Sequence, residues 1–437
     1  MRLAIIRQRY KPQGGAERFL EGALEALLER NVAITLYTRE WPQTKLQLIE
    51  PHIVDPFYLG PLWRDWGFAR AINHEIARTR ANLVQSYERV LCCDIYRPAD
   101  GVHATWLEER LQDAPASLRL RVAMDPWHRY HLAMERKLFA SPWLRAVLCN
   151  SKMVRDDIKA RFGLPDERLP VLYNAVDSSV FSPELRVHRE RIRAKYRIPS
   201  EATLFLLVGS GFRRKGVPAA IAALAQLSTP AHLVVVGDDR HLDAYKRMAR
   251  EHGVREHVTF AGFQHDVAPF YGAADAFVLP AIYDSLPDAA MEALASGLPV
   301  VTSTKSGAAE LVTENDAGFV CASRDVVALT EHLRTLQDAD TRARLGANAR
   351  RAVEPLTTAA MTLKLVLIYK GLLEASIAHK MAARAAAAEG PPPGPATTGE
   401  APPLHGADGL DSETLPASEA EHRPPVAPRG PPRPPHR

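Results

Sequence analysis

The chain has 437 residues, which is too long for one hydrophobic core and indicates two domains. A net charge of +4 is small for this length and argues against a dedicated nucleic-acid-binding protein. The four cysteines lack CxxC spacing, which indicates neither a disulfide framework nor a zinc site and favours the cytosol. No apolar run approaches the roughly 20 residues of a membrane span, so we expect any membrane contact to be peripheral.

The first half of the chain alternates short apolar runs with amphipathic stretches. Residues 3–6 and 33–37 are predicted strands, and the apolar positions between them fall on one helical face, which is typical of a βαβ unit. Residues 83–86 and 146–150 are predicted to be later strands of the same sheet. The segment 171–177 then leads toward a second unit.

The second half repeats the same pattern. A charged and helical connector after Arg186 ends at Pro199. Helices are then predicted over 326–351 and 357–388. The pattern therefore predicts an α/β protein with two tandem doubly wound, Rossmann-like domains, 1–178 (completed by about 357–385) and 179–356. The buried parallel strands predicted for the second domain are 203–208, 232–236, 257–260, 276–280 and 299–302.

The C-terminal segment 390–437 has the composition of a disordered tail. It contains fourteen prolines and no aromatic residue or isoleucine, so it cannot bury enough apolar surface to offset the entropy of ordering. A linker or a polyproline segment that binds a partner is the alternative to a passive tail.

Two glycine-containing loops each follow a predicted strand and precede a predicted helix. The first holds Gly14 and Gly15, where backbone N–H groups could meet an anion or a sugar, although a plain tight turn explains the pair equally well. The second places Arg213, Arg214 and Lys215 beside glycines. It matches neither a Walker loop nor a dinucleotide fingerprint, but three cations at the carboxyl end of a strand suit a diphosphate better than a solvated turn.

The stretch 284–301 carries two acidic residues, Asp284 and Glu292, with seven residues between them. Asp284 ends a loop after an apolar run, and Glu292 falls about one turn into the next helix. Both carboxylates can then face the mouth of a strand–loop–helix unit and hold sugar hydroxyls. The alternative is an acidic helix start that the macrodipole favours. The sequence GLPVV at 297–301, a helix stop followed by a buried strand, indicates half of a nucleotide-binding crevice.

With these motifs, the chain resembles glycosyltransferase family 4, the retaining nucleotide-sugar transferases of GT-B architecture, over about residues 1–380. Within that family it is most similar to bacterial lipopolysaccharide core glycosyltransferases. The resemblance implies two Rossmann-like domains that face a central cleft. It is carried by GGAE at 14–17, DGVH at 100–103, VLCNS at 147–151, YNAVD at 173–177, RKG at 214–216, and the pair Asp284 and Glu292 with GLPVV after it.

The resemblance also implies residue roles. Arg214 and Lys215, with Arg213 nearby, would neutralise the diphosphate, and Glu292 would hold the ribose hydroxyls. Asp284 would contact the donor sugar, and His103 would lie near the anomeric carbon, so these two are the expected catalytic residues. The remaining expected donor contacts are Gly14 and Gly15 beneath the phosphate and the helix start formed by Leu286, Pro287, Asp288 and Ala289.

Three positions depart from the family pattern. Asp284 stands where most members have glutamate, which shortens the reach by one methylene and bears on donor identity. Ser210 lies near the place where many members have an arginine, so Arg213 or Arg214 must supply that charge. Asp288 replaces a more usual glycine or asparagine, and its carboxylate could face a donor hydroxyl or cap the helix.

The implied reaction is the transfer of a hexose, expected to be glucose from UDP-glucose, with retention of anomeric configuration. By family analogy no cofactor or metal is needed, because cationic side chains stabilise the leaving group. Asp238 and Asp239 are interpreted as a loop acid pair without the Asp-x-Asp arrangement of a metal site. The alternatives are a GT-B-type nucleotide-sugar epimerase and a non-catalytic nucleotide-sugar-binding protein.

The expected acceptor is a lipopolysaccharide core or related lipid-linked glycan at the cytoplasmic face of the inner membrane. Residues 110–145 contain seven Arg or Lys against three Asp or Glu, interleaved with aromatic residues. Such a segment suits anionic lipid headgroups or a phosphorylated lipid-linked sugar, and an ordinary basic helix face with aromatic core anchors is the alternative. Trp63 and Trp66 are predicted to fill the core, and a part in the acceptor surface is the alternative.

Overall fold

The computed structural model describes residues 1–9, 23–25, 27–29, 32–41 and 51–388, with side chains given as far as residue 375. The glycine pair Gly14 and Gly15 and the predicted tail 390–437 lie outside the described residues. The chain divides into two compact units, Met1–Met381 and Ala382–Arg437. Everything below concerns the first unit.

The first sheet is parallel throughout and has six strands in the described part of the chain, in the order β3-β2-β1-β4-β5-β6. Strand β1 (Arg2–Ile6) lies centrally, and its Leu3 to Ile6 side chains are buried. The other strands are β2 (Ala33–Thr38), β3 (Pro51–Ile53), β4 (Leu83–Ser86), β5 (Ile95–Tyr96) and β6 (Ala146–Val147). The connecting helices include α2 (Gly60–Arg78), α3 (His103–Leu111), α4 (Ala116–Met124), α5 (Pro126–Phe139) and α6 (Lys152–Phe162).

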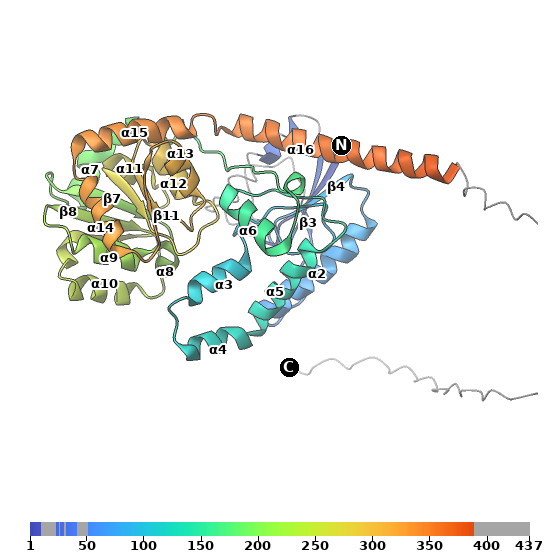
Figure 1. The fold of residues 1–437 in the computed structure, drawn as a ribbon, viewed down its shortest axis with the longest axis horizontal. Coiled ribbons are helices and arrows are strands. Elements are labelled where there is room, and N and C mark those ends of the chain that lie inside the picture. The colour runs from blue at the N-terminus through green and yellow to red at the C-terminus, as the bar shows by residue number, and fades with distance from the viewer. Residues whose placement is uncertain (10–22, 26, 30–31, 42–50, 389–437) are drawn as a thin grey trace, which may run out of the picture. The chain divides into compact units, whose positions relative to one another are not determined.

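The second sheet is also parallel, with six described strands in the order β12-β11-β10-β7-β8-β9. Helices cover both of its faces, as expected for strands that are buried on both sides (Figure 1). The strands are β7 (Thr203–Val208), β8 (Ala231–Val236), β9 (Val258–Gly262), β10 (Ala276–Leu279), β11 (Val300–Ser303) and β12 (Gly318–Cys321). The helical segments are η2 (Pro183–His188), α7 (Arg189–Tyr196), α8 (Phe212–Lys215), α9 (Val217–Leu224), α10 (Leu242–Glu251), α11 (Ala268–Ala273), α12 (Asp288–Ala295), α13 (Ala308–Glu314), α14 (Val326–Thr335) and α15 (Ala339–Val353).

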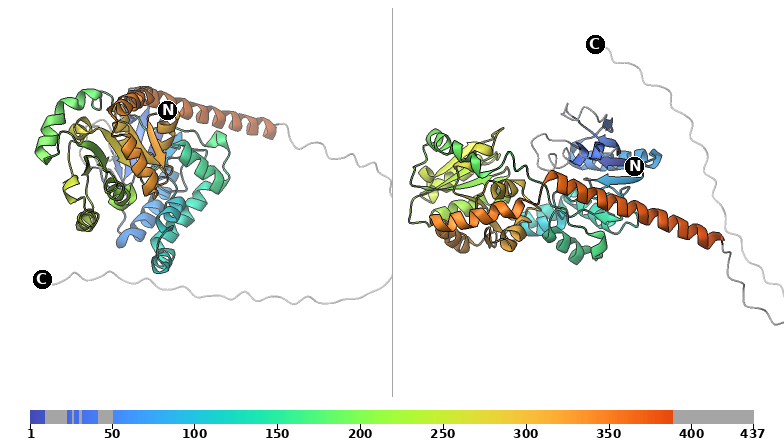
Figure 2. Two further views of the ribbon diagram at one scale, coloured as in Figure 1. Left: turned by 60° about the vertical axis from the view of Figure 1, so that its left-hand side comes forward. Right: turned by 90° about the horizontal axis from the view of Figure 1, so that it is seen from above.

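The last helix, α16 (Thr358–Ala388), packs on the first sheet although it follows the second in sequence (Figure 2). Its Met361, Leu365 and Tyr369 belong to the same buried cluster as Leu3 and Ile5. The Tyr369 hydroxyl also donates a 2.6 Å hydrogen bond to the Gln85 side chain in β4. The hydrophobic core beside the first sheet therefore includes residues that follow the second sheet in the chain.

Several sequence predictions need correction. Trp63 and Trp66 were expected in the core, but their exposed fractions are 43% and 47%. The strand expected at 146–150 ends at Val147. The helix expected at 326–351 is broken after Thr335, and Asp338 caps α15 by accepting from Thr341 N. In the described part of the chain no single helix is long and apolar enough to cross a bilayer, and one bent pair, 339–353 with 358–375, reaches that length and composition only in combination.

Candidate active site

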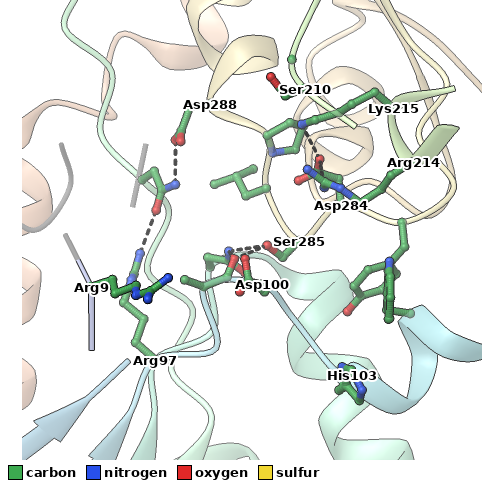
Figure 3. Close-up of a pocket in the computed structure, with 18 of the residues that line it drawn as sticks. Arg9, Arg97, Asp100, His103, Ser210, Arg214, Lys215, Asp284, Ser285 and Asp288 are labelled. Atoms are coloured by element: carbon green, nitrogen blue, oxygen red, sulfur yellow. Dashed lines mark hydrogen bonds and ion pairs between the residues drawn. The ribbon is translucent and has the colours of Figure 1, made fainter. Parts of the chain in front are cut away.

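A cavity of about 1100 Å³ is lined by residues from both sheets. Figure 3 shows Arg214, Lys215 and Asp284 together on one side of it; Arg97, which follows β5, and His103, which begins α3, lie elsewhere in the view. The cavity lies at the carboxyl ends of β7 and β10, because Gly209, Ser210 and Asp284 follow those strands. Ligands of open parallel sheets bind at this edge.

The loop after β7 fixes two cations in the cavity. Gly216 follows α8 with φ +81°, and a Cβ atom there would lie 2.1 Å from the Pro280 carbonyl oxygen, so only glycine fits. This close approach brings α8 against the segment after β10. Lys215 Nζ donates a 2.7 Å bond to Asp284 Oδ2, and Arg214 Nη1 donates a 2.8 Å bond to the same oxygen.

Asp284 is almost fully buried, with 7% of its surface exposed. Burial by itself would raise the pKa of its carboxyl group, but the neighbouring charges of Lys215 and Arg214 outweigh burial and lower the pKa below its ordinary value. The group is therefore ionised at neutral pH. One carboxylate thus holds two cations in place.

Helix α12 supplies the next part of the wall. It begins at Asp288 after Pro287, and Glu292 lies one turn further on, 4% exposed, where it accepts a 2.7 Å bond from the Tyr271 hydroxyl. Asp288 accepts a 2.8 Å bond from Asn174 Nδ2, and the Asn174 side-chain oxygen accepts one from the buried Arg97 (Figure 3). Asp288 is therefore bonded to a side chain from outside its own helix.

His103 begins α3 on the other side of the cavity. Its backbone N–H donates a 2.8 Å bond to Glu135 Oε1, and Ala104 N donates to Glu135 Oε2 at 3.1 Å. Glu135, in α5, is 1% exposed and is also paired with Arg89. Burial, and then the charge of Arg89, lowers the pKa of the His103 ring well below its ordinary value, so the ring is neutral. Its Nε2 lies 3.2 Å from His128 Nδ1.

A second carboxylate on this side organises a group of rings. Asp65 of α2 accepts bonds from Trp127 Nε1 at 2.8 Å and from His131 Nε2 at 3.1 Å. Burial would raise the pKa of Asp65, but hydrogen bonds from His131, Arg64 and Trp127 lower it below its ordinary value. Trp106, Trp127, Tyr130 and His131 all line the cavity.

The loops from the two sheets are directly hydrogen-bonded beside the cavity. Val102 N donates a 2.9 Å bond to the Tyr283 hydroxyl, and Ser285 Oγ donates a 2.5 Å bond to Ala99 O. Asn150 Nδ2 donates to Ser285 Oγ at 3.0 Å. The loop that leads into His103 is therefore tied to the residues on either side of Asp284.

The structure brings most of the predicted site residues together. His103, Arg214, Lys215, Asp284 and Glu292 line one cavity, as do Leu286, Pro287, Asp288 and Ala289. Arg213 is exposed and is not among the residues that line it, whereas Ser210 and Arg214 both line it. Gly14 and Gly15 lie outside the described residues.

Sequence reasoning missed Asp65, Glu135 and Tyr283, which stand in no recognisable motif. Asn150 and Asn174 lie inside the stretches 147–151 and 173–177, which had been noted without a role for either amide. In the described residues no group of three His, Cys, Asp or Glu could hold a metal ion. Asp238 and Asp239 instead accept backbone bonds from Phe263 N and Phe212 N.

Two family descriptions match the chain. Residues 13–180 match glycosyltransferase family 4, and residues 188–352 match glycosyl transferases group 1. The chain therefore belongs to glycosyltransferase family 4 and is an enzyme that uses a nucleotide sugar. The family and the GT-B fold expected from the sequence are both confirmed.

Individual relatives agree with this assignment. The lipopolysaccharide glucosyltransferase WaaG of Escherichia coli (strain K12) is 26% identical over 330 residues, which cover 74% of this chain and 85% of that protein. The crystal structure of WaaG, a glycosyltransferase involved in lipopolysaccharide biosynthesis, superposes with a TM-score of 0.71 at 24% identity, covering 84% of this chain and 99% of that one. Anabaena HepE in complex with UDP-glucose gives 0.64 at 18% identity, covering 85% and 100%.

Proposed function

We propose that this enzyme transfers glucose from UDP-glucose, with retention of configuration, to a lipopolysaccharide core or a related lipid-linked or cell-surface glycan. The observation that carries the proposal is the arrangement of Lys215, Arg214 and Asp284 beside the start of α12 in one cavity. Two fixed cations and a helix N-terminus suit a nucleoside diphosphate. The choice of glucose and uridine rests on two similar proteins, the glucosyltransferase WaaG and HepE, whose structure is a complex with UDP-glucose.

In this proposal the diphosphate takes the place of Asp284 as the partner of Lys215 and Arg214. The carboxylate released in this way accepts hydrogen bonds from the donor sugar, while Glu292, held by Tyr271, accepts them from the ribose. The backbone N–H groups of Leu286, Asp288 and Ala289 approach a phosphate oxygen or a sugar hydroxyl. Gly14, Gly15 and Arg213 keep their expected supporting roles as predictions.

The proposed reaction is a single displacement on one face of the sugar. The bond between the anomeric carbon and the phosphate oxygen breaks, and the nucleoside diphosphate leaves with the electron pair. The acceptor oxygen bonds to the anomeric carbon from the same face, and its proton passes to a phosphate oxygen. His103 lies beside the developing oxocarbenium ion, and Lys215 and Arg214 stabilise the leaving charge without a metal ion.

For the acceptor, we propose the wall formed by α2, α3 and α5. Trp106, Trp127 and Tyr130 offer ring faces to a sugar, and Arg64 and Arg9 offer positive charge to an acceptor phosphate. Exposed Leu120 and Met124 on α4, beside Arg119 and Arg121, suit peripheral contact with an anionic membrane. That contact would place the enzyme at the cytoplasmic face of the inner membrane.

The test is release of nucleoside diphosphate from a panel of UDP-, GDP- and ADP-sugars, with and without extracted core lipid and with and without EDTA. We expect acceptor-stimulated, EDTA-resistant release from UDP-glucose and an α-linked product. Release from another donor would correct the sugar or the base. Binding of UDP-glucose without release or transfer to any acceptor would overturn the proposal, and conversion of UDP-glucose into another UDP-sugar would favour the epimerase alternative.

A further inference from the structure

A second cavity, of about 700 Å³, lies at the opposite edge of the second sheet. Asp275 and Pro299, which line it, directly precede β10 and β11, so the cavity is at the amino ends of these strands. The donor cations lie at their carboxyl ends. The remaining walls come from η2, from the end of α12 and from α15.

The charge of this second cavity is strongly positive. Of the described residues that line it, five are arginines and one is acidic. The acid, Asp275, is already shared, because it accepts bonds from Arg189 at 2.8 Å and from the buried Arg193 at 2.7 Å. The other four arginines have no carboxylate partner among the described residues. They are Arg186, Arg342, Arg350 and Arg351.

Two of these arginines are held in position by backbone carbonyl groups. Arg342 Nη1 donates to Leu336 O and Gln337 O at 2.8 Å, and Arg350 Nη1 donates to Ala295 O at 2.7 Å and to Phe181 O at 3.0 Å. These bonds fix each guanidinium group through one nitrogen and leave its positive charge unneutralised. The other donors of the same planar fork remain for a ligand.

Arg186 has no hydrogen bond or ion pair within the described part of the chain. Partial burial, and then the charge of Arg189, lowers the pKa of its guanidinium group; the charge of Asp275 opposes this shift and that of Arg342 adds to it. Nothing in the fold therefore requires a cation at this position, and an anion placed between Arg186 and Arg342 would relieve their repulsion.

Small side chains shape the cavity. Gly346 packs so closely on the Gly297 carbonyl oxygen that a Cβ atom would lie 2.4 Å from it, and Ala343 and Ala347 line the same face of α15. The described lining contains no aromatic residue, so nothing there would stack on a nucleobase or a sugar ring. The chemistry fits a compact ligand with several anionic oxygens.

We propose that this arginine cavity binds a compact polyphosphate, with pyrophosphate as its simplest representative. Arg186 and Arg351 approach from the rim, and Arg342 and Arg350 form the fixed floor. The cavity also contacts the donor site through α12: Arg350 bonds Ala295, the last residue of that helix, whose first turns carry Asp288 and Glu292. We infer that binding of a polyphosphate in this cavity changes the turnover of donor, an inference that rests on the proposed function.

Binding is tested first, by calorimetric titration of pyrophosphate into the full-length Lys215→Ala protein, in which the donor site has lost a phosphate partner. We expect saturable binding that the additional change Arg186→Glu or Arg351→Glu weakens by about tenfold or more, since each removes a charge-assisted contact. Arg344→Glu is the matched control, because Arg344 lies on α15 outside the cavity and pairs with Asp316. It should leave the affinity within about twofold.

Absence of saturable binding in Lys215→Ala, or equal affinity in Arg186→Glu and Arg344→Glu, would overturn the proposal. Thermal unfolding of each variant, with Arg186→Gln as a milder change, separates loss of binding from loss of fold. Kinetics against donor then test the coupling. Pyrophosphate that competes at the donor site raises the KM for donor and leaves kcat unchanged. Pyrophosphate bound in the arginine cavity also changes kcat, and Arg186→Glu should abolish this change in kcat. Failure to detect any transfer would count against the proposed function and leave the binding result standing.

Discussion

The two walls of the large cavity differ in how they present chemistry. The wall from the second sheet carries charges on short segments that follow a strand, and Lys215 and Arg214 each donate to Asp284, at 2.7 Å and 2.8 Å. The wall from the first sheet carries rings beside its charged groups, and two acids hold its parts in place: Asp65 holds Trp127 and His131, and the buried Glu135 holds the amides at the start of α3. The first arrangement suits a charged donor, and the second offers ring faces to a sugar beside the positive charge of Arg64 and Arg9.

The difference follows from the position of each wall in its sheet. A loop at the carboxyl end of a parallel strand is short and rigid, so two or three residues suffice to fix a charge. The first-sheet wall instead combines side chains from α2, α3 and α5, which only helix packing brings together. We therefore expect changes on the donor wall to reduce catalysis sharply, and changes on the acceptor wall to be graded.

The largest effect is expected from Lys215→Ala and Glu292→Ala. Removing a fixed charge from the leaving group, or the ribose partner, should lower kcat/KM for donor by about a hundredfold or more. The measurement is nucleoside diphosphate release at several donor concentrations, with Lys246→Ala on the exposed face of α10 as the control. Near-normal turnover in both variants, with unchanged thermal unfolding, would contradict the assignment of the donor wall.

Glu135→Gln should have the next largest effect. The variant keeps the size of the side chain but offers only one acceptor to the two amides of His103 and Ala104, so His103 loses part of its positioning. We expect kcat to fall by about tenfold while donor KM stays unchanged, and Glu135→Asp to recover part of the loss. If both variants lose kcat to the same extent and both also lose thermal stability, the role of Glu135 is purely structural.

Trp127→Ala tests the acceptor wall. Loss of the ring should raise KM for acceptor by about tenfold through lost stacking and leave donor KM within about twofold, and Trp127→Phe should lie between the two proteins. The measurement is an acceptor titration at saturating donor. A change in donor KM of the same size would show that this wall does not belong to the acceptor.

Asp284→Glu is expected to alter preference more than rate. The added methylene gives the side chain the reach of the glutamate that most family members have and shifts the carboxylate relative to Lys215. The ratio of kcat/KM values for two donor sugars should therefore change by about tenfold. The donor panel described above gives this ratio. An unchanged ratio would mean that Asp284 holds the cations without contacting the sugar.

The smallest effect concerns stability. His232 in β8 is 3% exposed, and burial, followed by the charge of His257, lowers its pKa to about 4. In the unfolded chain His232 binds a proton as the pH falls through about 6.5, whereas in the folded protein it binds one only near pH 4. The free energy of unfolding therefore decreases between these two pH values, by at most about 3 kcal/mol. Denaturant unfolding of wild type and His232→Gln between pH 7 and 4 should show a shallower decrease in the variant. Parallel curves would assign the pH dependence to other groups.

The sequence by itself determined the alternating pattern of strands and helices, because buried parallel strands require continuous apolar runs. It also determined the loop with Arg214 and Lys215 and the pair Asp284 and Glu292, since each is local to one strand–loop–helix unit. These features were enough to indicate the family. Strands β3, β5 and β12 were not predicted, because β3 and β12 are partly exposed strands at the sheet edges and β5 has only two residues, so none of them forms a clear buried apolar run.

Only the tertiary structure decided which side chains meet across elements. The buried face of α2 is set by Phe68, Ile72 and Ile76, and Trp66 lies about 200° around the helix from Phe68, so it is turned to the surface. Asp65 reaches Trp127 and His131 because α2 packs on α5, and nothing near Asp65 in the sequence announces that contact. Likewise Asp284 was expected to contact a sugar, and only the structure shows that its carboxylate pairs with Lys215 and Arg214. Local pattern fixes the direction of the backbone, but partners that are distant in sequence are chosen by packing and by the need to pair buried charge.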